Sequence, residues 1–160
     1  MNICEYMSPP LVEMNFSAED KQQLLEKLVE GIHRRNLIEE PAEVLNSLIE
    51  RERLMTTGIK KGYAIPHAFT QQIEKSIVFF VRLVEPIDYQ SLDGEPVSIV
   101  FLLIGPPNAQ GIHLKLLARL ARLLSQGHLF KNLMAAETPE EIIDIIGKEE
   151  THFNLSKTSS

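Results

Sequence analysis

The sequence predicts an α/β protein, a three-layer sandwich in which a mixed, mostly buried sheet carries helices on both faces. Residues 76–83 and 97–104 are almost continuously apolar and rich in β-formers, which is typical of strands covered on both faces. Segments with apolar residues at helical spacing precede this pair of strands, and others follow it. Helices on both sides of two buried strands in the chain favour helices on both faces of the sheet.

The first third of the chain predicts a short strand and two helices. Residues 11–14 could form the strand. Ser17 and Asp20 resemble a capping box, and the apolar residues that follow recur at helical spacing, so we expect a helix from Ser17 to about Arg34. Pro41 suits the first turn of a second helix, which an apolar stripe continues to about residue 53.

The middle of the chain changes from helical to extended character. Gly58 and Gly62 bracket a turn, and residues 63–65 form a short strand that leads into Pro66. Because proline donates no ladder hydrogen bond and disfavours helix at the residue before it, we expect this strand to end near His67. The two buried strands follow it.

Three helices are predicted after the second buried strand. Residues 105–108 break the chain before a helix over about 111–125, and a shorter helix follows Gly127 through Ala136. Thr138 caps the last helix, which we expect to end at Gly147. We interpret residues 1–150 as one domain and residues 151–160, which are polar and aperiodic, as a flexible tail.

Composition excludes several classes of protein. The chain has 160 residues, enough for one domain with a real core, and a formal charge of −6, which disfavours sequence-independent nucleic-acid binding. Cys4 is the single cysteine, so neither an internal disulfide nor a cysteine-based zinc cluster is expected. No apolar run reaches the ~18–20 residues that span a bilayer, and the first residues do not resemble a signal peptide. We expect a soluble, cytoplasmic protein without membrane insertion.

Two of the five histidines have a context that suggests chemistry. His67 follows a buried strand, and ligands of α/β proteins usually bind at the carboxyl ends of strands. His113 shares a helix face with leucines and lies in the first turn, where free N–H groups favour an anion. From context alone, a strand-edge histidine without a role and a core histidine bound to a backbone carbonyl remain the simpler interpretations.

Other site chemistries have little support. HxxxH and HExxH spacings are absent, no carboxylates can be named for a zinc site, and no GxxxxGK[ST] phosphate loop is present, so we expect no metal and no cofactor. No acidic residue occurs between Pro96 and Ala136, whereas Lys115, Arg119 and Arg122 share one helix face. That face is either a solvated surface or, together with Lys60 and Lys61, a docking surface for an acidic partner.

Several motifs together resemble one known family. The runs Glu50-Arg51-Glu52, Thr56-Thr57-Gly58-Ile59, Gly62 to His67 (GYAIPH), Asp93 to Val97 (DGEPV) and Gly111 to Leu117 (GIHLKLL) are similar to the enzyme IIA domain of the bacterial phosphoenolpyruvate-dependent phosphotransferase system, mannitol/fructose type, which includes the nitrogen-regulatory IIA proteins. The similarity covers about residues 10–147. The turn with Lys60 and Lys61, and Met55 where glycine is frequent, depart from the family pattern and leave partner preference open.

The resemblance implies a site and a set of partners. In that family the histidine of the AIPH element, here His67, accepts a phosphoryl group through Nε2 from the carrier protein HPr. His113 would lie beside it, and Arg51 would face the same pocket and hold phosphoryl oxygens. A neutral imidazole suits such an acceptor because its pKa lies near 6.5. The implied sheet between layers of helices agrees with the fold class predicted from the residues.

Three functions remain open at this point. A regulatory protein of the nitrogen type would control kinases or transporters through its phosphorylation state, and a sequence with only a IIA-like module favours this alternative. A sugar-transport IIA component would instead pass the phosphoryl group to a IIB domain. A third possibility is a binding module in which His67 is silent.

Overall fold

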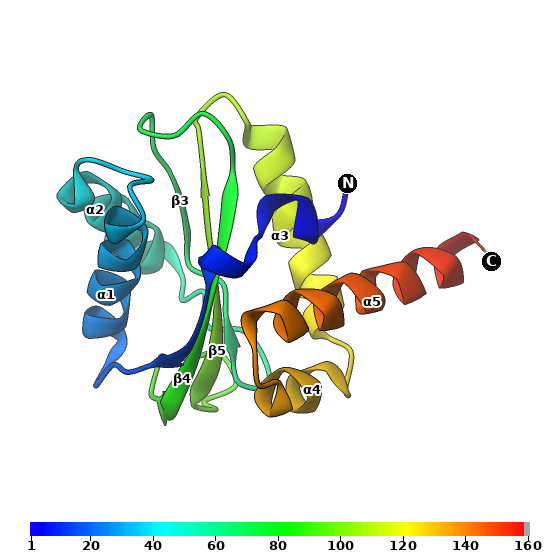
Figure 1. Cartoon of the computed structure of the whole chain (residues 1–160). Coiled ribbons are helices and arrows are strands. Elements are labelled where there is room, and N and C mark those ends of the chain that lie inside the picture. Colours follow the sequence, from blue (N-terminus) through cyan, green and yellow to red (C-terminus); the bar gives the residue numbers. More distant parts are fainter. Residues whose placement is uncertain (159–160) are drawn as a thin grey trace.

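A computed structural model describes residues 1–158 and confirms the α/β class (Figure 1). Its mixed sheet has five strands in the order β1-β4-β5-β2, and β3 also pairs with β5. The strands are β1 (Val12–Phe16), β2 (Tyr63–Ala64), β3 (His67–Phe69), β4 (Ile77–Ile87) and β5 (Val97–Gly105). The two predicted buried strands are therefore β4 and β5, which pair antiparallel at the centre of the sheet.

The outer strands run parallel to their neighbours. β1 lies along β4, whereas β2 and β3 follow one another along the other side of β5. Side chains of the central strands alternate between the two faces, as pleated strands require. Val100 and Leu102 of β5 enter one core cluster, and Phe101 and Leu103 enter the other.

Helices cover both faces of the sheet, as predicted (Figure 1). On one face lie α1 (Lys21–Arg34) and α2 (Pro41–Leu54), whose leucine and isoleucine stripes pack on β4 and β5. On the other face lie α3 (Gln110–Leu124), α4 (Leu129–Ala135) and α5 (Pro139–Thr158), together with the short 3₁₀ segment η1 (Ile3–Tyr6). A second 3₁₀ segment, η2 (Pro9–Leu11), leads into β1.

The start of α1 differs from the prediction. The helix begins at Lys21 rather than near Ser17, because Asp20 is the residue whose side chain accepts a hydrogen bond from the backbone N–H of Gln23. The side chain of Gln23 in turn accepts from the backbone N–H of Glu19 at 2.8 Å. The reciprocal cap therefore lies three residues later in the chain than the sequence pattern indicated.

The end of α5 also differs, because the helix passes Gly147 and continues to Thr158. The sequence predicted a flexible tail over residues 151–160; residues 151–158 instead continue the helix beyond Gly147, and residues 159–160 lie outside the described residues. Glu150, in the part of α5 beyond Gly147, is buried. Its carboxylate accepts a hydrogen bond from the backbone N–H of Ile3 at 2.8 Å and forms an ion pair of 3.2 Å with Arg119. Such tertiary contacts outweigh the modest helix-breaking tendency of a single glycine.

Most of the predicted cationic stripe is engaged by α5. Arg119 pairs with Glu150, and the guanidinium of Arg122 lies 3.7 Å from the ring centroid of Phe153. Lys115 remains exposed on the same helix. The stripe therefore contributes to the packing of α3 against α5. Within residues 1–158, no helix has the length and apolar character needed to cross a membrane.

Arg82 of β4 connects the sheet to the end of α4. Its guanidinium donates to the carbonyl oxygens of Leu133, Met134 and Ala136 at 3.1, 3.2 and 2.6 Å, and to that of Met14 at 3.4 Å. The carbonyls of Leu133, Met134 and Ala136 lie at the C-terminus of α4, where the backbone carries partial negative charge, whereas Met14 belongs to β1. One cation thus satisfies several backbone acceptors from two segments.

We predict that Arg82→Met lowers the free energy of unfolding by about 2–3 kcal/mol. Methionine keeps the apolar stem but cannot donate, and a hydrogen bond involving a charged group contributes roughly 1.5–3 kcal/mol. Chemical denaturation of both proteins measures the difference. The matched control is Arg53→Met, whose side chain is 69% exposed and pairs with Glu50 on the surface; we expect a change within about 0.5 kcal/mol. Equal losses in both variants would contradict this role for Arg82.

Candidate functional site

His67 lies on the edge strand β3, directly after the proline that separates β3 from β2. The sequence predicted that a strand would end near His67; instead, a new strand begins there, in parallel register with Leu103 of β5. The carbonyl of Pro66 accepts a hydrogen bond from the N–H of Leu103 at 3.0 Å, so the ladder continues through the proline. Proline lacks a donor but keeps its acceptor, which is why it interrupts the strand without ending the pairing.

Hydrogen bonds fix the tautomer of the His67 ring. Nδ1 lies 2.7 Å from the carbonyl oxygen of Ile65, which can only accept, so Nδ1 carries the proton. Nε2 lies 3.1 Å from Nε of Arg51, which can only donate. Nε2 therefore holds the lone pair of a neutral imidazole. It is the nucleophilic nitrogen of this ring.

Arg51 reaches the ring from the last turn of α2. A second nitrogen of its guanidinium donates to the carbonyl oxygen of Met55 at 3.0 Å. The remaining donors of the planar fork leave capacity for an anion. The structure therefore brings together the arginine and the histidine that the sequence singled out.

His113 lies in the first turn of α3, and its ring lies next to the ring of His67. The centroids of the His67 and His113 rings are 5.5 Å apart, and the ring of Phe69 lies 4.2 Å from that of His113. His113 is only 5% exposed, as its place on the leucine face predicted. The alternative that a backbone carbonyl satisfies it is wrong, since neither ring nitrogen has a hydrogen-bond partner among residues 1–158.

These three residues line one pocket of about 430 Å³. Asn46, Ser47 and Glu50 of α2 and Ala68 and Phe69 of β3 complete its wall. The pocket lies where the end of α2 and the beginning of α3 meet the edge strand. It places the lone pair of Nε2 of His67 beside a guanidinium, which suits the capture of an anionic group.

Burial keeps both imidazoles neutral. The pKa of His67 is lowered mainly by desolvation, an effect that its bond to Ile65 opposes and the positive charge of Arg51 reinforces. Burial lowers the pKa of His113 to about 4, and His67 adds to the shift. At neutral pH, both rings are therefore uncharged, and Arg51 supplies the positive charge of the site.

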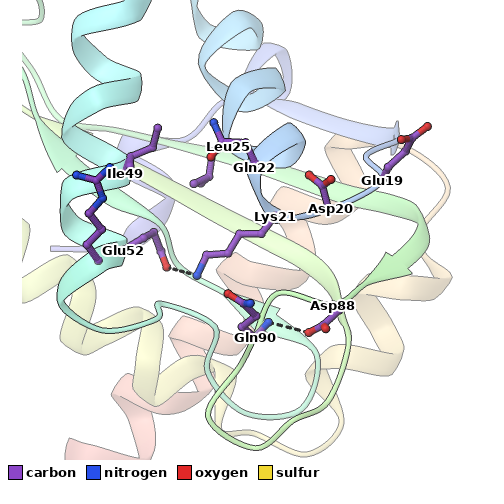
Figure 2. A pocket seen from close by; sticks show the side chains of 10 residues that line it. Glu19, Asp20, Lys21, Gln22, Leu25, Ile49, Glu52, Asp88 and Gln90 are labelled. Carbon is purple, nitrogen blue, oxygen red and sulfur yellow. Dashed lines mark hydrogen bonds and ion pairs between the residues drawn. The ribbon is translucent and has the colours of Figure 1, made fainter.

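The carboxylate of Glu52, one residue after Arg51, connects the end of α2 to other segments of the chain. Glu52 accepts hydrogen bonds from the hydroxyl of Tyr89 at 2.9 Å and from both the backbone N–H and the hydroxyl of Thr57. Its other contact is an ion pair of 2.7 Å with Lys21, which Figure 2 shows as a dashed line across a second pocket. Lys21 also lies 4.5 Å from the ring centroid of Tyr89. This cluster ties α1, the loop after α2 and the segment after β4 to the turn that carries Arg51.

No motif in the sequence predicted this supporting cluster. Glu52 was visible only as the neighbour of Arg51 in a charged motif, and Tyr89 is 37 residues further along the chain. The one available signal was an acid in the last turn of a helix, where the helix dipole disfavours it unless other groups compensate. The fold supplies that compensation.

The remaining histidines lie away from this site. His33 and His152 are exposed, and His128 pairs with Glu149 at 2.7 Å. Among the residues that the structure describes, no group of three or more histidine, cysteine or acidic side chains gathers in a way that could hold a metal ion. Of the five histidines, His67 and His113 line the pocket, together with Arg51.

Comparison with known proteins relates this fold to one family. The family described as "Phosphoenolpyruvate-dependent sugar phosphotransferase system, EIIA 2" matches residues 5–149. The chain is 37% identical to the nitrogen regulatory protein of Bradyrhizobium diazoefficiens, over 91% of this chain and 95% of that protein. It is 31% identical to the fructose-specific EIIABC component of Bacillus subtilis, over 94% of this chain but only 24% of that longer protein.

A solved structure gives the same result. The nitrogen regulatory protein IIA-Ntr of Neisseria meningitidis superposes with a TM-score of 0.84 at 32% identity, covering 90% of this chain and 98% of that one. Fold, motifs and the extent of the match agree. The chain belongs to the EIIA type 2 family of the phosphoenolpyruvate-dependent sugar phosphotransferase system and is a phosphotransfer component.

Proposed function

We propose that His67 accepts a phosphoryl group on Nε2 from the phosphohistidine of an HPr-type carrier. The observation that carries this proposal is the pair of hydrogen bonds on the ring, with Nδ1 donating to Ile65 and Nε2 accepting from Arg51. A P–N bond forms at Nε2 as the P–N bond of the carrier breaks, and the carrier nitrogen leaves with the electron pair. His67 keeps its Nδ1 proton throughout.

Arg51 and His113 stabilise the transferring group. Phosphoryl transfer proceeds through a loose transition state, which needs in-line positioning and donors to the equatorial oxygens. Nε of Arg51 donates a hydrogen bond to the lone pair of Nε2 of His67, which is the lone pair that attacks. The guanidinium therefore has to move from Nε2 onto the phosphoryl oxygens as the group arrives. Neutral His113 donates one N–H, and the N-terminus of α3 adds a favourable dipole.

Exposed apolar side chains around the pocket would receive the carrier. Leu54 and Met55 follow Arg51 and are 81% and 59% exposed, and Leu114, next to His113, is 69% exposed. A large exposed apolar side chain is unremarkable alone, but several close in the chain to residues that line one pocket are typical of a protein–protein contact. We therefore assign carrier docking to these residues.

The regulatory alternative is the better supported of the two downstream roles. The nitrogen regulatory protein of Bradyrhizobium diazoefficiens, at 37% identity, is matched over 95% of its length, whereas the fructose-specific component of Bacillus subtilis, at 31% identity, is matched over only 24%. In this proposal, residues 1–150 form the phosphoryl-accepting unit of a cytoplasmic protein whose phosphorylation state controls its binding to target proteins. The second candidate is a sugar-specific component that passes the group to a IIB domain.

We predict that His67→Ala abolishes phosphorylation, because it removes the acceptor nitrogen. Incubation with phosphoenolpyruvate, enzyme I and HPr (or its nitrogen-related paralogue), followed by mapping of acid-labile phosphate, measures the effect. His33→Ala removes an exposed histidine and serves as the matched control, with full labelling expected. Labelling of the His67→Ala protein, or of another residue in the unmodified chain, would refute the assignment.

We predict that His113→Ala slows phosphoryl transfer by roughly 10²–10³-fold while His67 still accepts the group, since one preorganised donor contributes on that scale. Rapid-quench measurement of single-turnover transfer gives the rate, and circular dichroism checks that the variant is folded. His128→Ala, which removes a histidine outside the pocket, should transfer at the normal rate. Complete loss of labelling in a folded His113→Ala protein would argue for a different division of labour.

We predict that His67 and His113 both titrate below ~6.5, the ordinary imidazole value, with His113 near 4. Protonation-sensitive NMR shifts of the two rings measure this directly. The unfolded chain binds a proton at His113 near pH 6.5 and the native chain does not, so stability should decrease as pH falls from about 6.5 to 4. The His113→Gln protein should lose less stability over that range. Titration of either ring above 6.5 would contradict the proposed neutral site.

A further inference from the structure

The hydrogen bond that fixes the proton of His67 ends on a residue that is itself held in place. The carbonyl oxygen of Ile65 lies 2.7 Å from Nδ1 of His67, and the N–H of Ile65 donates to the carbonyl oxygen of Thr57 at 3.0 Å. Ile65 and Thr57 are both 5% exposed, so water competes little for these groups. The residue that fixes the ring is therefore positioned by the loop that follows α2.

A short antiparallel pairing explains this contact. Gly58 forms a bridge with Ala64, the first residues on either side of which are Thr57 and Ile65. The bond between Thr57 and Ile65 continues the pairing by one step. Pro66 restricts the backbone of the residue before it to extended conformations, so Ile65 has little freedom to adjust alone. A shift of Thr57 would therefore carry the carbonyl of Ile65 with it.

The carboxylate of Glu52 holds Thr57 at two points. It accepts hydrogen bonds from the N–H of Thr57 at 3.1 Å and from its hydroxyl. The hydroxyl of Tyr89 donates to the same carboxylate at 2.9 Å and lies 3.0 Å from the hydroxyl of Thr57. The ion pair with Lys21 completes the set (Figure 2), and the side chain of Glu52 is 7% exposed. Because hydrogen bonds to an ionised group are stronger than neutral ones, this set fixes Thr57 firmly.

We propose that Glu52 is a positioning residue for His67 and acts on the ring through Thr57 and Ile65. The bonds run from the carboxylate to Thr57, from the carbonyl of Thr57 to Ile65, and from the carbonyl of Ile65 to Nδ1 of His67. Their consequence is that Nδ1 keeps the proton and Nε2 presents the lone pair. This inference rests on the proposed function only for its effect on transfer, because the tautomer belongs to the resting protein.

Arg51 cannot by itself maintain this tautomer during transfer. Its guanidinium leaves Nε2 of His67 when the phosphoryl group arrives, so the ring then depends on the bond at Nδ1. A neutral imidazole whose Nδ1 is poorly held divides between two tautomers, and the one with its proton on Nε2 has no lone pair there to attack. The support from Glu52 therefore matters most when Arg51 is engaged with the phosphoryl oxygens.

The test compares the unmodified protein with Glu52→Gln, Thr57→Val and Thr57→Ser. Glutamine removes the charge and keeps the shape, valine removes the hydroxyl, and serine keeps it. Thr70→Val is the matched control, because Thr70 is 2% exposed and its hydroxyl also donates to a glutamate, Glu43, at 2.6 Å. Ring ¹⁵N shifts of His67 in the unphosphorylated proteins report the tautomer. Single-turnover transfer from the phosphorylated carrier reports the rate.

Two further variants separate positioning from stability. Arg82→Met lowers the stability at a place that shares no hydrogen bond with the chain from Glu52 to His67. Tyr89→Phe removes a single bond to Glu52 and keeps the aromatic ring, so it tests the same connection if Glu52→Gln does not fold. Circular dichroism and chemical denaturation establish which variants are folded.

We expect the proton of His67 on Nδ1 in the unmodified protein and a mixture of tautomers in Glu52→Gln and Thr57→Val. Both variants should transfer about three- to tenfold more slowly, the scale of one lost hydrogen bond. Tyr89→Phe should change both properties in the same direction. The normal tautomer and the normal rate are expected in Thr57→Ser, Thr70→Val and Arg82→Met.

Several results would overturn the inference. A proton on Nε2 of His67 in the unmodified protein would contradict it, and so would an unchanged tautomer in folded Glu52→Gln or Thr57→Val. Equal mixing of tautomers in Thr70→Val would show that any lost buried hydroxyl loosens the ring. If His67 takes no phosphate in any of these proteins, the proposed function fails, but the tautomer measurement still tests the connection. If His67 is phosphorylated normally and Glu52→Gln has no effect, the function stands and the positioning role falls.

Discussion

The two hydrogen bonds on the ring of His67, one at each nitrogen, are the constraint on which the rest of the site depends. One ring nitrogen is committed to the carbonyl of Ile65, two residues earlier, so the other must present its lone pair. Such a bond needs a backbone that turns between two short strands, and Pro66 provides it without breaking the ladder to β5. The proposed nucleophile is thus set by the local chain rather than by a separate catalytic base.

Positive charge and desolvation then act in the same direction. Arg51 lies against Nε2, and burial disfavours an imidazolium, so the ring stays neutral and the guanidinium is the cation of the pocket. Holding that cation in place requires the end of α2 to be rigid. Glu52 supplies the rigidity through bonds to three other segments of the chain, which separates the residue that contacts the ring from the one that supports it.

Much of the fold and the core of the site were accessible from the sequence. Almost continuous apolar runs predicted β4 and β5, and helical spacing of apolar residues predicted the amphipathic helices. The motifs around Arg51, His67 and His113 contain residues that line one pocket. The errors were at boundaries, where local signals compete. Ser17 and Asp20 could both cap α1, and Gly147 could end α5, but contacts of Glu150 with the N-terminal segment carry the helix onward.

The sequence by itself determined the periodicity of the elements and the motifs that contain the candidate site residues, because both are properties of neighbouring positions. Only the tertiary structure decided which nitrogen of His67 is free and that Glu52 meets Tyr89. These relations join residues far apart in the chain. They depend on strand register and on the angles at which helices cross the sheet, and no local pattern encodes either.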